Sequence, residues 1–218
     1  MKDIAVYGAG SYGQEIACLI RKLNSVARTG DTIWNFVGFF DDDETLWDKE
    51  TGYGKVIGGF DVLNSWTSSL SVAIAIANVS ALHHILSRIQ NPLICFPNIV
   101  DPETSFLDIA SFSIGKGNII GAGCRFSPKV SLGDFNIIVN DSVFGHDVSI
   151  GNFNIFFPEV RLSGCVSVGH DNMFGVRTVV LQGFKIGSGV KMASGSFLMN
   201  DAVDGYLYRG NPARKIKL

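Results

Sequence analysis

The chain has 218 residues, of which 46% are hydrophobic and 17% charged, and its net charge at pH 7 is −2. These values are typical of a globular protein with one large or two small domains, and the near-neutral charge gives no electrostatic case for nucleic-acid binding. No apolar run reaches the length of a transmembrane helix, and residues 1–25 carry polar groups where a signal peptide is apolar. We therefore expect neither a membrane nor a nucleic acid as a partner.

The four cysteines, at positions 18, 95, 124 and 165, are scattered along the chain and show no metal-ligand spacing. Thiols in this pattern, without an export signal, are typical of reduced cysteines in a cytoplasmic protein. We expect a cytoplasmic location and no metal site.

The first segment predicts a strand, a glycine-rich turn and a helix. Residues 4–7 are apolar, residues 8–13 read GAGSYG, and an apolar stripe at helical spacing follows. A second predicted strand, residues 35–40, ends in an acidic run, at the position where nucleotide-binding folds read ribose hydroxyls. This pattern predicts nucleotide contacts from Gly8, Gly10, Ser11, Gly13, Asp41 and Asp42. The alternative is that the glycines only make a tight turn and the acidic residues lie in a solvated loop.

The remainder of this half continues the alternation of strand and helix. Residues 72–77 and 93–96 are predicted strands, and residues 80–90 form a predicted helix. The alternation indicates an open parallel α/β sheet, and we place this Rossmann-like domain at residues 1–98. Such a length allows one mononucleotide-binding half, which weakens a reading of the chain as an NAD-dependent oxidoreductase.

The second half, residues 99–218, carries a repeat with a period of six. Every sixth residue from position 114 to position 198 is large and apolar, which chance produces about once in 10⁵ frames. The members are Ile114, Ile120, Phe126, Leu132, Ile138, Phe144, Ile150, Phe156, Leu162, Val168, Phe174, Val180, Ile186, Met192 and Leu198. A chain that turns a corner every six residues, as in a parallel β-helix of hexapeptides, explains this period. Glycine follows many of these residues, which suits a corner.

Three hexapeptides make one triangular coil, so residues eighteen apart stack at about 4.8 Å. One such column reads Asn118, Asn136, Asn154 and Asn172. We expect a structural ladder in which the side-chain amides bond from coil to coil.

A second column reads Pro128, His146, Gly164 and Gln182 and suggests chemistry. An imidazole can act as a general base near neutral pH, and a glycine beside it leaves room for an acyl donor and a main-chain N–H for an oxyanion. Asp147 is the candidate to orient the ring. The alternative is an ordinary surface histidine. His170 lies in another column and could meet His146 only across a subunit boundary.

Several segments together resemble the sialic-acid/bacillosamine acetyltransferase family, which are hexapeptide-repeat O- or N-acetyltransferases with a Rossmann-like N-terminal domain. These are the glycine-rich opening, VIGGFDVL (56–63), FPNIV (96–100) before the hexapeptides, GHDVSIG (145–151) and RGNPARKI (209–216). The resemblance spans essentially the whole chain. It implies a left-handed β-helix, a homotrimer with active sites between subunits, acetyl-CoA as co-substrate and a nucleotide-linked amino sugar as acceptor.

The resemblance also implies roles for individual residues. His146 is the expected general base, Gly164 the expected contact to the thioester carbonyl, and the coenzyme A arm is expected to run past Gly183. The arm is expected to end near three residues of the RGNPARKI segment, which are Asn211, Pro212 and Arg214.

Two positions depart from the family pattern. Relatives often carry a second histidine where this chain has Ile155, and Pro-Gly where it has Gln182 and Gly183. Two rival functions therefore stay open: acetyl transfer to a sugar hydroxyl, and a nucleotide-binding scaffold without turnover.

Overall fold

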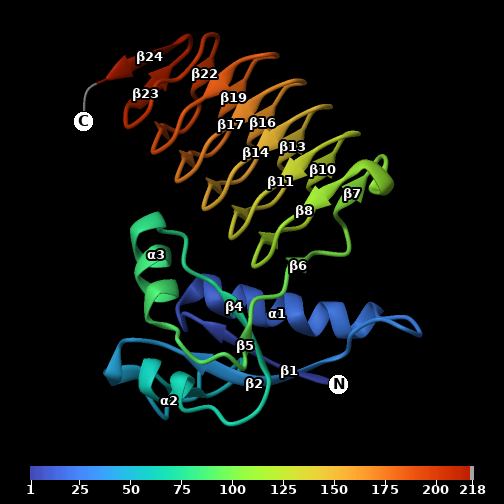
Figure 1. Cartoon of the computed structure of the whole chain (residues 1–218), viewed down its shortest axis with the longest axis vertical. Helices are drawn as coiled ribbons and strands as arrows, with labels where there is room; N and C mark the ends of the chain where they lie inside the picture. Colours follow the sequence, from blue (N-terminus) through green and yellow to red (C-terminus); the bar gives the residue numbers. More distant parts are fainter. Residues whose placement is uncertain (217–218) are drawn as a thin grey trace. The chain divides into compact units, whose positions relative to one another are not determined.

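The structure is a computed structural model that describes residues 1–216; residues 217 and 218, which the predicted second domain includes, lie outside the described range. The chain divides into two compact units, Met1–Pro102 and Glu103–Leu218 (Figure 1). The boundary predicted at residue 98 thus lies four residues before the division between these units.

The first unit is a parallel α/β sheet with the strand order β3-β2-β1-β4-β5. Its strands are β1 (Lys2–Tyr7), β2 (Trp34–Phe40), β3 (Val56–Gly58), β4 (Leu70–Ile74) and β5 (Ile94–Cys95). The next strand, β6 (Ile99–Val100), belongs to a different sheet. Its helices are α1 (Ser11–Val26), the 3₁₀ turn η1 (Glu44–Leu46), α2 (Phe60–Asn64) and α3 (Val79–Arg88). The order changes direction between β1 and β4, and ligands bind open α/β sheets at such a switch point.

Most elements of this unit were predicted, but four short ones, β3, η1, α2 and β6, were not. The strand β3 and the helix α2 have only three and five residues, too few to show a period of 2 or 3.6. The predicted strand 72–77 ends three residues earlier than expected, because the chain leaves the sheet after Ile74.

The second unit is a three-sided parallel β-helix whose coils follow one another from β7 to β22 (Figure 1). The first face holds β7 (Ser105–Phe106), β10 (Arg125–Phe126), β13 (Val143–Phe144), β16 (Arg161–Leu162), β19 (Val179–Val180) and β22 (Phe197–Leu198). The second holds β8 (Ser113–Ile114), β11 (Ser131–Leu132), β14 (Ser149–Ile150), β17 (Ser167–Val168) and β20 (Lys185–Ile186). The third holds β9 (Ile119–Ile120), β12 (Ile137–Ile138), β15 (Ile155–Phe156), β18 (Met173–Phe174), β21 (Lys191–Met192), β23 (Leu207–Gly210) and β24 (Ala213–Ile216). A 3₁₀ turn, η2 (Ile109–Ser111), joins the first two strands.

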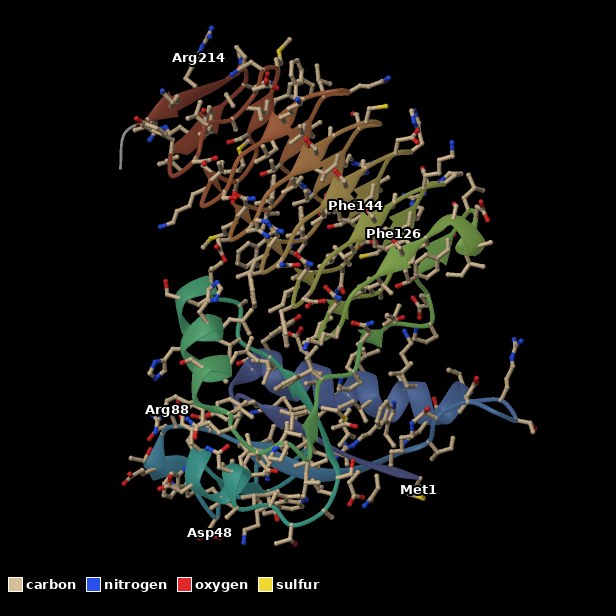
Figure 2. All side chains as sticks on the ribbon, viewed as in Figure 1. Met1, Asp48, Arg88, Phe126, Phe144 and Arg214 are labelled. Atoms are coloured by element: carbon tan, nitrogen blue, oxygen red, sulfur yellow. The ribbon has the colours of Figure 1, made fainter. Side chains whose placement is uncertain are left out.

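The period of six arises because each two-residue strand ends in the residue that points inward. All members of the apolar series are buried except the first, Ile114, which is half-buried. The rings of Phe126 and Phe144, one coil apart, stack with centroids 4.8 Å apart (Figure 2). The predicted fold class, a Rossmann-like domain followed by a left-handed parallel β-helix, is confirmed.

The asparagine ladder is also confirmed. All four side chains are fully buried, and each Oδ1 accepts hydrogen bonds from the next coil. For example, Asn136 Oδ1 accepts from the main-chain N and the Nδ2 of Asn154, both at 2.9 Å. The ladder pairs polar groups that would otherwise be costly to bury.

The glycines that follow the apolar residues were predicted to provide the backbone conformation of the corners, but the structure gives them another role. The left-handed backbone positions of the corners come two residues later, at residues such as Asp147 (φ 56°) and Cys165 (φ 58°). A Cβ on Gly145 would lie only 2.5 Å from the main-chain N of Gly164. These glycines therefore allow successive coils to approach closely.

Within residues 1–216, no helix is both long and apolar enough to span a lipid bilayer.

Candidate active site

The β-helix carries two histidines at equivalent places, each two residues after a buried apolar residue. His170 belongs to a chain of hydrogen bonds in which each side chain accepts from the main-chain N–H one coil earlier. In each pair the main-chain N–H of the first residue donates to the side chain of the second. The pairs are Lys116 and Asp134, Asp134 and Asn152, Asn152 and His170, His170 and Ser188, and Ser188 and Asp204. Because Nδ1 of His170 accepts from Asn152 N at 3.0 Å, a neutral His170 carries its proton on Nε2. His170 therefore has a structural role, because its Nδ1 is part of this chain of hydrogen bonds.

His146 lies in a column where this chain of bonds is broken. The residue one coil earlier is Pro128, which has no N–H to donate. The residue one coil later is Gly164, which has no side chain to cap the N–H of His146. Neither ring nitrogen of His146 therefore accepts a hydrogen bond from a main-chain N–H in this column. The side chain of His146 is 53% exposed.

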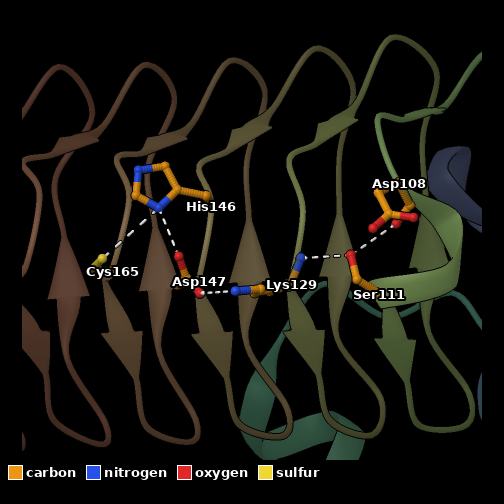
Figure 3. A network of polar contacts seen from close by, with 6 residues as sticks. All are labelled: Asp108, Ser111, Lys129, His146, Asp147 and Cys165. Carbon is orange, nitrogen blue, oxygen red and sulfur yellow. Dashed lines mark hydrogen bonds and ion pairs between the residues drawn. The ribbon is translucent and has the colours of Figure 1, made fainter.

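Asp147 orients the imidazole. Its Oδ2 lies 2.9 Å from Nδ1 of His146 (Figure 3). The corner places Asp147 in the left-handed region, with its N–H donating to the carbonyl of Pro128 at 3.1 Å. An aspartate in this conformation is well tolerated. Since the carboxylate accepts, the proton of a neutral ring sits on Nδ1, and Nε2 keeps a free lone pair.

Gly164 lies directly beside Nε2 of His146. A Cβ at this position would lie 2.5 Å from Nε2 of His146 and 2.6 Å from Cε1. The space expected to be open above Gly164 is thus occupied by the imidazole ring, and Gly164 is buried. Within residues 1–216, the N–H of Gly164 has no hydrogen-bond acceptor, which leaves the donor unpaired.

Cys165 completes this corner and was not predicted. Its Sγ lies 4.0 Å from Nδ1 of His146, and its N–H donates to the His146 carbonyl at 2.8 Å. Cys165 and Asp147 occupy equivalent positions on successive coils. No local cysteine motif marks this thiol in the sequence. Its spacing of eighteen residues, one coil, from Asp147 would have predicted that the two residues lie together.

In the first unit, the glycine-rich loop divides into packing and exposed residues. Gly8 has a φ of 102°, and its Cβ would meet the Ile76 side chain. Gly13 is buried against the carbonyl of Gly8, so that α1 packs closely on the loop. Gly10 and Ser11 are exposed at the N-terminus of α1, where open N–H groups and the helix dipole favour an anion.

The two predicted acidic residues lie at the end of β2 and already have protein partners. Asp41 accepts hydrogen bonds from the N–H groups of Ala9 at 2.8 Å and Asp43 at 3.0 Å. Asp42 accepts from the hydroxyl of Tyr7. Burial, followed by this bond, raises the pKa of Tyr7 far above its ordinary value, so the phenol stays a donor. Asp41 therefore holds the glycine-rich loop through Ala9, and Asp42 holds the end of β1 through Tyr7.

The residues expected to contact coenzyme A lie toward the end of the β-helix. Gly183 is exposed, with a φ of 81°, and its N–H donates to the Gly164 carbonyl at 3.0 Å. Asn211 and Pro212 form the exposed turn between β23 and β24, and Arg214 faces solvent on β24 (Figure 2).

The two departures from the family pattern lie in different environments. Ile155 is fully buried in β15, so this position adds to the core instead of offering a polar contact. Gln182, by contrast, is exposed on the corner beside Gly183.

Comparison with known proteins agrees with this architecture. Residues 3–89 match the PglD N-terminal domain family, whereas no curated protein matches the sequence. The acetyltransferase domain of PglB from Neisseria gonorrhoeae FA1090, in complex with acetyl coenzyme A, superimposes with a TM-score of 0.85 at 26% identity over 99% of both chains. WeeI from Acinetobacter baumannii AYE has a TM-score of 0.86 at 23% identity, covering 99% of this chain and 100% of its own.

A third similar structure is a variant of perosamine N-acetyltransferase from Caulobacter crescentus, in complex with CoA and GDP-perosamine. Its TM-score is 0.85 at 22% identity, covering 99% of this chain and 97% of its own. The resemblance stated from the sequence is therefore confirmed: residues 3–89 match the PglD N-terminal domain family, a hexapeptide-repeat β-helix follows, and the whole chain is similar to these acetyltransferase structures.

Proposed function

We propose that the protein transfers an acetyl group from acetyl-CoA to the amine of a nucleotide-linked amino sugar. The observation that carries this proposal is the half-exposed side chain of His146, whose Nε2 keeps a free lone pair because Asp147 faces Nδ1. The similarity to the PglB acetyltransferase domain, which was solved with acetyl coenzyme A, supports the donor. The similarity to the perosamine N-acetyltransferase variant, which was solved with CoA and GDP-perosamine, supports the acceptor class.

In the proposed reaction the amine attacks the thioester carbonyl carbon while Nε2 of His146 accepts a proton from the amine. The Gly164 N–H stabilises the oxyanion of the tetrahedral intermediate. Collapse of this intermediate breaks the carbon–sulfur bond. The leaving thiolate takes the proton from Nε2, which releases coenzyme A as the free thiol and restores neutral His146. Asp147 stabilises the imidazolium that forms, because its carboxylate faces Nδ1 at 2.9 Å. No metal is required in this sequence of steps.

We assign the nucleotide to the first unit. The exposed N–H groups at Gly10 and Ser11 suit a phosphate. Asp41 and Asp42 supply oxygens at the neighbouring strand end. Gly8 and Gly13 contribute by shaping the loop.

We assign coenzyme A to the corner that runs from Gly164 past Gly183 and ends near Asn211, Pro212 and Arg214. Arg209 lies directly opposite Arg214 across the β23–β24 hairpin. This pairing puts two positively charged residues at opposite positions, and a phosphate of coenzyme A bound by both would offset their repulsion.

We further propose a homotrimer with its active sites between subunits, working in the cytoplasm. The thiols of Cys18, Cys95 and Cys165 are exposed and unpaired in disulfides, which suits a reducing compartment.

The proposed acceptor is tested with purified protein, acetyl-CoA and two matched acceptors, a nucleotide-linked amino sugar and its hydroxyl analogue. We expect release of free thiol with the amine only. Faster release with the hydroxyl sugar would favour O-acetylation, while nucleotide binding without any thiol release would favour the scaffold.

Replacing Gly164 with alanine is expected to lower kcat by about 10- to 100-fold, because the new Cβ displaces the imidazole ring. The backbone of Gly164 is not in the left-handed region, and the obstructing group is a side chain, so the melting temperature should change little. The neighbouring Ser163→Ala variant is the control and should keep its turnover. A Gly164→Ala enzyme with normal kcat would show that the position of the ring is unimportant.

A further inference from the structure

The corner around His146 brings together three different metal-ligating groups. Nδ1 of His146, a carboxylate oxygen of Asp147 and Sγ of Cys165 all lie within 4.8 Å of one another. Among residues 1–216 this is the one cluster of three such side chains. All three are exposed, so an ion can enter from solvent and keep an open position for water.

The backbone holds this cluster in place. Asp147 and Cys165 sit at equivalent left-handed corners one coil apart, and each N–H bonds to the coil before it. Figure 3 shows the side chains of Cys165 and Asp147 converging on the same ring nitrogen. The ligands are therefore organised by the fold before any ion binds.

We propose that His146, Asp147 and Cys165 form a binding site for a single divalent ion of the zinc type. A sulfur, nitrogen and oxygen set suits such an ion, which binds these atoms at about 2.0–2.3 Å with tetrahedral neighbours about 3.5 Å apart. The present distances to Nδ1, 2.9 Å from Asp147 and 4.0 Å from Cys165, differ from this spacing by roughly half an ångström. With thiolate and carboxylate both ionised, the site neutralises a doubly charged ion.

Lys129 is the nearby cation that the ion has to tolerate. Its Nζ lies 4.0 Å from Asp147 Oδ1, but the side chain is 73% exposed and can turn into solvent. The repulsion between this ammonium group and a bound ion is therefore avoidable.

Occupation of the site inhibits the enzyme through the tautomer of His146, a consequence that rests on the proposed acetyl transfer. An ion on Nδ1 displaces the proton from that nitrogen. A neutral imidazole then carries its proton on Nε2, so Nε2 loses the lone pair that accepts the proton of the amine. The ion thus converts the base into a group that cannot act.

The site is tested by titrating Co²⁺ into the reduced, metal-free, full-length protein under argon. A thiolate–cobalt absorption band that saturates at one equivalent and is removed by Zn²⁺ is expected for the wild type. The band should disappear in Cys165→Ser and persist in Cys18→Ser, which removes an exposed thiol far away in sequence. Absence of the band in the wild type, or an equal band in Cys165→Ser, overturns the site.

Turnover provides a separate readout, followed by loss of thioester absorbance. Zn²⁺ should slow the wild type by about tenfold or more, with recovery after a chelator is added. The turnover of Cys165→Ser should lose its sensitivity to Zn²⁺. A cobalt band without inhibition overturns the tautomer mechanism. A protein without turnover on any acceptor refutes the proposed function, while the cobalt titration still decides the metal site.

Discussion

Replacement of His146 by alanine is expected to lower kcat by about 10² to 10⁴-fold while acetyl-CoA affinity stays nearly unchanged. The loss corresponds to roughly 3–5 kcal/mol of activation free energy. It follows from removing Nε2, the nitrogen that accepts the amine proton. The ring is half exposed and makes one side-chain hydrogen bond within normal bonding distance, to Asp147, so its removal should cost little stability.

The matched control is His170→Ala. This histidine occupies the same place within its hexapeptide, but its Nδ1 caps the N–H of Asn152. Its loss should cost about 1 kcal/mol of stability and leave kcat within about twofold. Steady-state kinetics and acetyl-CoA binding measured on both variants decide between the two histidines. Wild-type turnover in His146→Ala refutes the assignment of the base, and equal loss in both variants would point to a shared role across subunits.

The architecture was predictable because the β-helix has a simple rule. Each strand offers one inward position, so a fixed frame of apolar residues and a column of asparagines are visible in the sequence without coordinates. Handedness was not visible, since spacing alone does not distinguish left from right. The short elements β3 and α2 were also missed, because they are too brief to show a period.

The site was only partly predictable. The adjacency of His146 and Gly164 follows from their spacing of eighteen residues, but the contact between the ring and the glycine depends on a rotamer. Pro128 carried a signal that the sequence reasoning did not use, because its missing N–H frees His146 from the capping that holds His170. Cys165 escaped notice because its relation to Asp147 exists only through the coil.

Replacing Asn154 with alanine is expected to destabilise the β-helix by about 3 kcal/mol. Asn154 is fully buried, and its Nδ2 donates to Asn136 Oδ1, to Asn152 O and to Gly169 O. Its Oδ1 accepts both the main-chain N and the Nδ2 of Asn172. Truncation leaves the buried donors of Asn172 without their acceptor and also opens a small cavity, and each unpaired buried group costs about 1–3 kcal/mol.

Thermal unfolding followed by circular dichroism measures this effect. A loss of about 3 kcal/mol in a chain of this size should lower Tm by about 6–12 °C. The exposed Asn200→Ala variant loses only a hydrogen bond from Nδ2 to the Asp201 carbonyl and should unfold within about 2 °C of the wild type. Equal shifts in the two variants would mean that the ladder only fills space. A larger shift for Asn154 would show that amide pairing between coils stabilises the β-helix beyond the filling of space.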